Sequence, residues 1–331
     1  MAYASQRRAR WKHLHDEVGK RIASMVGCEA AMVSAGAASA ITLGTAACMT
    51  GTNEGSIRQL PDTKGLKDEV IIQKAHRYDY EHAVRNCGAR FIEVETIEQC
   101  ERALGNRTAM LLFNYVREPE GQIKAAEFAT VGKKHRVPTL VDGAVSVPPP
   151  ENLSRLVHFG FDLAAFSGGK GLRGPYSAGL LLGRRDLVEA ARLNSSPNDD
   201  TIGRGMKVSK EELLGMMIAV EVSLKHDFQK ELLTKRKWLE KIGQEMDSIP
   251  GIKTEIVVNA LEGNQPHLRL TWDESVVRIS RTEAIRALKE GEPSVEVCLL
   301  ELTKGKFELT AWMIEEGEVK IVAKRLKEVL S

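Results

Sequence analysis

The sequence has few cysteines and no excess of charge of either sign. Its 331 residues include 5 cysteines, which are scattered and never form a C-x-x-C pair. This odd, dispersed set argues against a disulfide framework and against a zinc site, and it suits a reducing cytosol. The chain carries 47 Lys and Arg against 45 Asp and Glu, a formal net charge of +2. It therefore lacks the basic excess that favours nucleic-acid binding.

Long apolar runs are also missing. The most apolar stretch, residues 30–49, is rich in Ala, Gly, Ser and Thr, and the charged N-terminus lacks the apolar core of a signal peptide. We therefore expect neither a membrane span nor a secretory leader, and we predict a cytoplasmic protein without a metal site. No G-x-G-x-x-G turn follows the first predicted strand, which argues against a dinucleotide-dependent oxidoreductase.

Strand and helix patterns alternate through the first half of the chain. Several predicted strands contain continuous apolar runs, such as MLLF and LLL. Such runs are typical of strands buried on both faces, and the helices between them supply the crossovers that parallel strands need. The sequence therefore predicts an α/β domain with a mainly parallel sheet. Strands are expected at residues 69–75, 90–95, 108–116, 138–144, 162–168 and 178–184.

The pattern changes near residue 208, so we predict three parts. Residues 1–208 are expected to form a large α/β domain that includes a short N-terminal helix. Residues 209–246 have the pattern of a long, charged connecting helix with a bend near His226. Residues 247–331 predict a small α+β domain, with one of its strands at residues 295–302. A chain of this length is consistent with one large and one smaller domain.

A lysine follows one of the buried strands, in the segment FSGGKGLRGP at residues 166–175. Glycines flank Lys170 and let other groups approach its side chain closely. A lysine at the margin of a buried strand has a lowered pKa, which is what Schiff-base chemistry requires. Taken alone, G-G-K-G is more typical of a solvated surface turn.

Three further features lie at the ends of other predicted strands. Asp142 in LVDGA is suited to pair with a pyridinium nitrogen, although it could also cap a helix or bind a metal. In SAGAASA, residues 34–40, a strand leads into a glycine-containing helix N-terminus, which either binds phosphate or only caps and packs. His76 ends the strand EVIIQKA, where its ring would stack on a cofactor or pack in the protein.

These four features would lie at one edge of a parallel sheet, where α/β ligand sites form. Together they predict a pyridoxal-phosphate site. The chain resembles fold type I pyridoxal-phosphate enzymes, in particular the group of bacterial selenocysteine synthase (L-seryl-tRNA selenium transferase), and most of all the D-glucosaminate-6-phosphate ammonia-lyase family. The motifs that carry the resemblance are SAGAASAITLGTAACMTGT, FSGGKGLRGPYSAGLLLGR and IGRGMKVSKEELLGMMIAVE.

The resemblance implies a fold like that of aspartate aminotransferase and a role for each site residue. Lys170 would hold the cofactor as a Schiff base and then act as the base at Cα of the substrate. An ionised Asp142 would keep the pyridine nitrogen protonated, and His76 would stack on the ring. The residues expected to bind the cofactor phosphate are Ser34, Gly36, Ala37 and Ser167.

The implied reaction is β-elimination. Loss of the Cα proton and of a leaving group at Cβ would convert an amino acid or amino sugar acid, with or without a phosphate, to a keto acid and ammonia. Arg173, Arg204 and Lys207 are candidates for binding an acidic substrate, and Arg269 for gripping its carboxylate, although each also suits an ordinary surface position. Because fold type I sites usually form between subunits, a homodimer or larger homo-oligomer is expected.

The chain departs from the family in one respect. Family members carry a segment before the helix that begins here near Trp11, and we expect this segment to be absent or shortened. Any contact of that segment over the cofactor or across a dimer is therefore in doubt.

Several alternative functions stay open. A selenium transferase acting on seryl-tRNA is second, because the chain has no basic excess. A racemase, aldolase or aminotransferase shares the same anchor residues, and a pyridoxal-phosphate-binding protein without turnover comes last. A cysteine desulfurase is disfavoured, because Cys298 lies within a predicted strand.

Overall fold

The computed structural model describes residues 2–8, 10–259, 265–297 and 306–331. The chain divides into two compact units, Met1–His226 and Asp227–Ser331. Most of the strand expected at residues 295–302, including Cys298, lies outside the described residues.

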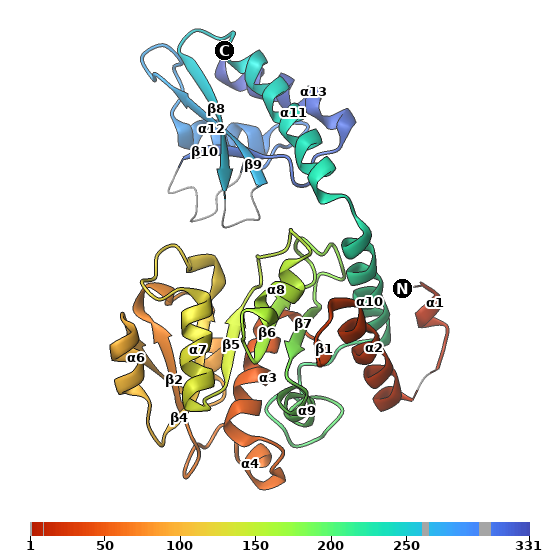
Figure 1. Ribbon diagram of the computed structural model, residues 1–331. Coiled ribbons are helices and arrows are strands. Elements are labelled where there is room, and N and C mark those ends of the chain that lie inside the picture. The colour runs from red at the N-terminus through yellow and green to blue at the C-terminus, as the bar shows by residue number, and fades with distance from the viewer. Residues whose placement is uncertain (1, 9, 260–264, 298–305) are drawn as a thin grey trace. The chain divides into compact units, whose positions relative to one another are not determined.

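The first unit is built on a seven-stranded sheet with the order β3-β2-β4-β5-β6-β7-β1 (Figure 1). Neighbouring strands from β3 to β6 are parallel, whereas β7 is antiparallel to both of its neighbours. The predicted α/β fold with a mainly parallel sheet is therefore confirmed. The strands are β1 Ala30–Ser34, β2 Glu69–Gln73, β3 Arg90–Val94, β4 Thr108–Asn114, β5 Thr139–Asp142, β6 Leu163–Ser167 and β7 Gly179–Gly183.

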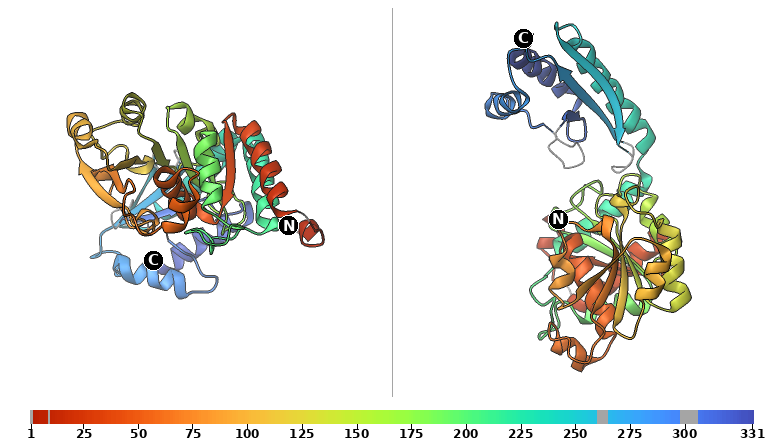
Figure 2. Two further views of the ribbon diagram at one scale, coloured as in Figure 1. Left: turned by 90° about the horizontal axis from the view of Figure 1, so that it is seen from below. Right: turned by 90° about the vertical axis from the view of Figure 1, so that its left-hand side faces the viewer.

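Helices cover both faces of this sheet (Figure 2). Successive residues of one strand enter opposite cores, as Ile71 and Ile72 of β2 do, which explains the continuous apolar runs. The first face is covered by α2 Trp11–Val26, α6 Ile97–Ala103, α7 Ala125–His135, α8 Asn152–His158 and α10 Lys210–Lys225. The second face is covered by α3 Gly36–Thr50, α5 His82–Arg85 and α9 Arg185–Leu193. The short helices α1 Ala2–Ser5 and α4 Glu54–Gln59 complete this unit among the described residues.

The second unit has a three-stranded antiparallel sheet packed against three helices. Its core includes Leu239, Leu268, Phe307 and Leu326. The elements are α11 Phe228–Met246, β8 Ile252–Asn259, β9 Gln265–Trp272, α12 Arg281–Glu290, β10 Phe307–Thr310 and α13 Val319–Leu330. None of the helices in the described ranges is both long and apolar enough to cross a bilayer.

The stretch expected to form one connecting helix over residues 209–246 is instead two helices. Helix α10 ends at Lys225, and the backbone of His226 is extended. Asp227 then begins α11, since its side chain accepts a hydrogen bond of 2.9 Å from the Lys230 amide. An N-cap of this kind starts a new helix, so the break falls where the chain divides into its two units.

A glycine lets three segments of the first unit meet at one point. Gly179 begins β7, and it is the register partner of Ser34 on β1 and of Ser167 on β6. A Cβ atom at this position would lie 2.5 Å from the carbonyl carbon of Gly36 and 2.7 Å from the carbonyl oxygen of Phe166. Because these neighbours are backbone atoms, they could move only by displacing the β1–α3 turn or β6.

We therefore expect Gly179→Ala to destabilise the protein by about 1–3 kcal/mol, the usual cost of overpacking. Gly105→Ala is the matched control, because a Cβ there meets no atom within 4 Å. Urea unfolding followed by circular dichroism measures both effects. Equal stabilities of the two variants would contradict the predicted close approach.

Candidate active site

The predicted strand-end residues lie along one edge of the sheet. Asp142 at the end of β5 is the register partner of Asn114 at the end of β4 and of Ala165 on β6. Two residues further along β6, Ser167 pairs with Gly179, which pairs in turn with Ser34. The loops that follow β1, β5 and β6 therefore begin side by side at this edge, where α/β proteins bind their ligands.

Asp142 is a buried carboxylate with two hydrogen-bond donors. Its Oδ2 accepts a hydrogen bond of 2.8 Å from the hydroxyl of Tyr78, and its Oδ1 accepts one of 2.9 Å from the Ala144 amide. Burial raises the pKa of Asp142, while these two donors and the charge of Lys170 oppose that rise. An acid held in this way gains from a cationic partner, and a pyridinium nitrogen is such a partner.

Lys170 lies on a tight turn after β6. The Gly168 amide bonds to the Ala178 carbonyl, and the Gly174 amide to the Gly168 carbonyl, both at 2.8 Å, so the loop is closed at its base. Lys170 remains solvent-accessible. The protein packed around its amine still lowers the pKa of Lys170, and the negative charge of Asp142 partly offsets this effect. The lowered pKa favours the neutral amine, which is the nucleophilic form.

The N-terminus of α3 has the features of an anion site beside this loop. Gly36 adopts the left-handed φ of +82°, and residue Ala35 before it gives the helix no side-chain cap. The first amides of α3 therefore lack partners within the helix, and they suit a phosphate. Ser34 was expected to bind the cofactor phosphate, but its side chain is buried and its hydroxyl donates to the Gly36 carbonyl at 2.9 Å. Ser34 therefore stabilises the turn between β1 and α3. Ala37 and Ser167 are half-buried.

His76 does not have the surroundings predicted for it. Its ring has no exposed surface and packs nearly perpendicular to the ring of Phe113, with 4.5 Å between ring centroids. Its Nδ1 accepts from the Asn114 amide at 3.3 Å, its Nε2 lies 3.2 Å from the Gln73 amide nitrogen, and burial lowers its pKa to about 4. A ring buried on all sides cannot stack on a cofactor, so the predicted stacking role is not supported and His76 belongs to the core.

Tyr78 is a further candidate site residue, and it was not among those predicted from the sequence. It lies two residues beyond His76, after the short 3₁₀ turn Lys74–His76, and it contacts Asp142 through its hydroxyl. Burial and the adjacent carboxylate raise the pKa of Tyr78, so the phenol stays protonated and donates. An aromatic hydroxyl just past a strand end was the available signal, but its partner is 64 residues away in the chain.

The candidate substrate cations do not all lie together. Arg204 and Lys207 line one cavity of about 440 Å³ together with Trp11 and the start of α10. This segment adjoins α3, because the Ser39 hydroxyl bonds to the Met206 sulfur at 3.2 Å. Arg173 is exposed on the Lys170 turn, with a left-handed φ of +52°.

Arg269 lies in the second unit, on β9, and is bound there by two carboxylates. Its guanidinium is 2.8 Å from Glu308 and 2.7 Å from Glu255. A role in gripping a substrate carboxylate would have to compete with both.

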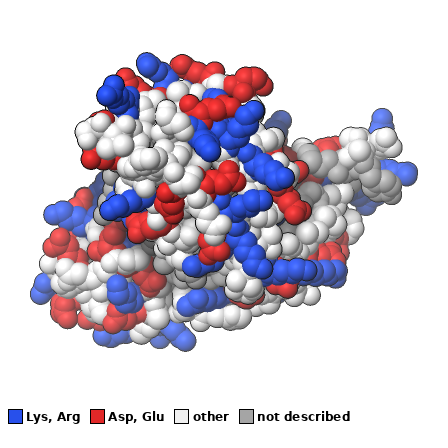
Figure 3. Space-filling view, turned by 90° about the horizontal axis from the view of Figure 1, so that it is seen from above, with Lys and Arg blue, Asp and Glu red and all other residues white. Residues whose placement is uncertain are grey.

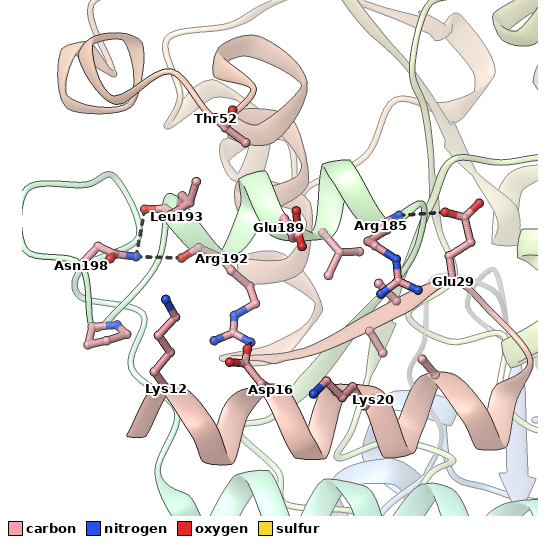
Figure 4. A pocket seen from close by; sticks show the side chains of 16 residues that line it. Lys12, Asp16, Lys20, Glu29, Thr52, Arg185, Glu189, Arg192, Leu193 and Asn198 are labelled. Carbon is pink, nitrogen blue, oxygen red and sulfur yellow. Dashed lines mark hydrogen bonds and ion pairs between the residues drawn. The ribbon is translucent and has the colours of Figure 1, made fainter. Parts of the chain in front are cut away.

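Another cavity of about 500 Å³ opens between α2, α9 and the start of β1 (Figure 4). The cavity is lined by Ala30, the first residue of β1. The predicted site lies at the opposite end of that strand, where Ser34 is the last residue. Its lining carries charges of both signs, and Asp16 pairs with Arg192 at its wall. It contains none of the predicted site residues. Within the described ranges, no group of three His, Cys, Asp or Glu could hold a metal ion.

The fold and this strand-end site define a fold type I pyridoxal-phosphate-dependent enzyme. The structure of a D-glucosaminate-6-phosphate ammonia-lyase matches with a TM-score of 0.85 at 24% identity, covering 99% of this chain and 89% of that one. Serine palmitoyltransferase from Sphingomonas wittichii matches with a TM-score of 0.57 at 14% identity, covering 96% and 76%.

The sequence comparisons give the family. The model of the L-seryl-tRNA selenium transferase family matches residues 3–249, and the chain belongs to this family. A 5'-C-glycyluridine monooxygenase-decarboxylase from a Streptomyces species is 29% identical, covering 96% of this chain and 81% of that protein. D-glucosaminate-6-phosphate ammonia lyase from Salmonella typhimurium is 25% identical, covering 96% and 85%. The L-seryl-tRNA(Sec) selenium transferase of Aquifex aeolicus is 26% identical, covering 84% and 69%.

We expect Tyr78→Phe to weaken pyridoxal-phosphate binding by about 10-fold to 100-fold, because hydrogen bonds to charged groups contribute about 1.5–3 kcal/mol. The loss of this donor raises the pKa of Asp142 further. Since affinity requires the ionised acid, it falls as the pH drops through that pKa, and in the variant this fall begins at a higher pH.

Absorbance titrations of the apoprotein with the cofactor across pH measure both effects. Tyr80→Phe is the matched control, because Tyr80 is 62% exposed. If Tyr78→Phe bound the cofactor like Tyr80→Phe at every pH, Tyr78 would have no influence on Asp142.

Proposed function

We propose that the protein is a pyridoxal-phosphate-dependent lyase that acts on an amino acid or amino sugar acid and releases a keto acid and ammonia. The observation that carries the proposal is the placement of the buried Asp142 at the end of β5 and of Lys170 on the turn after the neighbouring strand β6, near the uncapped N-terminus of α3. The relative named as an ammonia lyase, which is similar over 96% of this chain, supports the reaction type.

Different groups of the chain would bind different parts of the cofactor. Asp142 would pair with the ring nitrogen, Lys170 would bind the aldehyde carbon, and the first amides of α3 with Ser167 would bind the phosphate. The bound cofactor supplies an electron-withdrawing ring that acidifies the Cα proton of a substrate amine. Tyr78 would keep Asp142 oriented through the 2.8 Å hydrogen bond described above.

Lys170 would act as the base once the substrate amine has replaced it at the aldehyde carbon of the cofactor. The Cα–H bond breaks and its proton passes to the Lys170 amine, whose lowered pKa leaves it free to accept. The substituent at Cβ leaves with the electrons of its bond, as water when it is a protonated hydroxyl. Water adds back when the unsaturated product hydrolyses, so a β-hydroxy amino acid yields a keto acid and ammonia without any oxidant.

Arg204 and Lys207 would select acidic substrates. They line one cavity and stand on a segment bonded to α3 through Met206. A phosphate or carboxylate on the distal end of the substrate would be held by these two cations, with Arg173 on the Lys170 turn as a third. We propose that the enzyme works as a homodimer or larger homo-oligomer in the cytoplasm, as is common for symmetric assemblies of this fold.

Transfer to seryl-tRNA is the second candidate, and the match to the selenium transferase family favours it. The net charge of +2 and the mixture of both signs on the face seen in Figure 3 favour a small substrate instead. A gel shift with tRNA that weakens as salt rises would reverse this order.

We expect Lys170→Ala to lose the visible absorbance of the bound cofactor and all turnover, while keeping its far-ultraviolet circular dichroism. Borohydride reduction followed by peptide mapping of the unsubstituted protein should place the cofactor on Lys170. Lys133→Ala, at an exposed position on α7, is the control and should behave like the unsubstituted protein. A label on any other lysine would refute this assignment.

A substrate screen tests the reaction itself. D- and L-amino acids and phosphorylated amino sugar acids are incubated with the holoenzyme, and ammonia and keto acid are measured. We expect release of both in equal amounts, and we expect Arg204→Ala to raise the KM for phosphorylated substrates more than for unphosphorylated ones. Racemisation or transamination without ammonia would overturn the lyase assignment.

A further inference from the structure

A buried loop follows Asp142 and leads into α8. We call residues 143–151 the strap. Within it the Ser146 hydroxyl donates to the Gly143 carbonyl at 2.7 Å, which fixes the turn just after Asp142. At its far end Asn152 donates from Nδ2 to the Ser146 carbonyl at 2.6 Å. Ser146 and Asn152 are both buried, and their two hydrogen bonds fix the conformation of the strap from within.

The middle of the strap rests on the turn that carries Lys170. A Cβ atom at Gly171 would overlap the carbonyl oxygen of Val147 and would lie 2.5 Å from Cδ of Pro148. The strap therefore contacts the residue next to Lys170 with no space between them. One short segment is thus covalently joined to Asp142 and packed against the Lys170 turn.

The buried amide of Asn152 lowers the stability of the fold, so packing alone does not explain its presence. It is only 6% exposed, and its Oδ1 finds no hydrogen-bond partner among the described residues. A buried carbonyl oxygen without a partner destabilises a protein, and a leucine of similar shape would avoid that cost. The amide must therefore contribute something that packing alone does not, and its one visible bond holds the strap at Ser146.

We propose that Asn152 and Ser146 are positioning residues, which hold the strap so that Asp142 and Lys170 keep the separation that one cofactor molecule spans. The proposal rests on Lys170 and Asp142 being the cofactor residues, as proposed above. Neither positioning residue needs to touch the cofactor, because each acts through the backbone that joins the two cofactor residues.

The test uses Asn152→Leu and Ser146→Ala in the full chain. Three properties are measured: the dissociation constant of pyridoxal phosphate, the induced circular dichroism of its visible band, and the pH midpoint of that band. The matched control is Asn194→Leu. Asn194, just after α9, is also buried with a partnerless Oδ1, but its amide donates to the Ala190 carbonyl of α9 and to the Thr50 hydroxyl at the end of α3.

We expect both strap variants to bind the cofactor about tenfold more weakly, which is the effect of one lost buried hydrogen bond. The induced dichroism should shrink and the pH midpoint should rise, because Lys170 loses part of its packed surroundings. The control should change the urea midpoint of the apoprotein but neither spectral property.

Strap variants with the affinity, dichroism and pH midpoint of the control would overturn the proposal. Ser146→Ala guards against poor folding of Asn152→Leu, since it removes only one hydroxyl. If the unsubstituted protein formed no visible band on Lys170, the proposed function would fail instead, so the two failures are distinguishable.

Discussion

The burial of one carboxylate organises the site. Asp142 ends β5 inside the protein, where burial disfavours its charge, and the surrounding groups reduce that cost. The Tyr78 hydroxyl and the Ala144 amide donate to it, and Lys170 adds a positive charge nearby. A cationic ring nitrogen would complete this compensation.

Close backbone approaches give the Lys170 loop its shape. A Cβ at Gly168 would meet Met216 of α10 and the Ala178 carbonyl, one at Gly169 would meet the Tyr176 backbone, and one at Gly171 would meet the strap. The glycines beside Lys170 therefore do more than loosen the turn, because each admits a neighbour that fixes its position. This packing explains how a solvent-accessible lysine has a lowered pKa.

The relatives of this chain are named for different reactions. Relatives similar over most of this chain are named as a monooxygenase-decarboxylase, an ammonia lyase and a selenium transferase. If Lys170 and Asp142 bind the cofactor as proposed, the choice among such reactions would depend on other groups around them, such as Arg204 and Lys207.

By itself the sequence determined the α/β class, the positions of the strands and the candidacy of Lys170 and Asp142, because periodicity and strand-end chemistry are local properties. The sequence does not show which of His76 and Tyr78 contacts Asp142. Both follow β2, and only three-dimensional packing decides which side chain reaches the carboxylate. The hydrogen bonds that Ser34 and Asn152 make were likewise not visible in the sequence. Tertiary structure decided these because hydrogen bonds to buried groups depend on which backbones meet, as β5, the strap and the Lys170 turn do here.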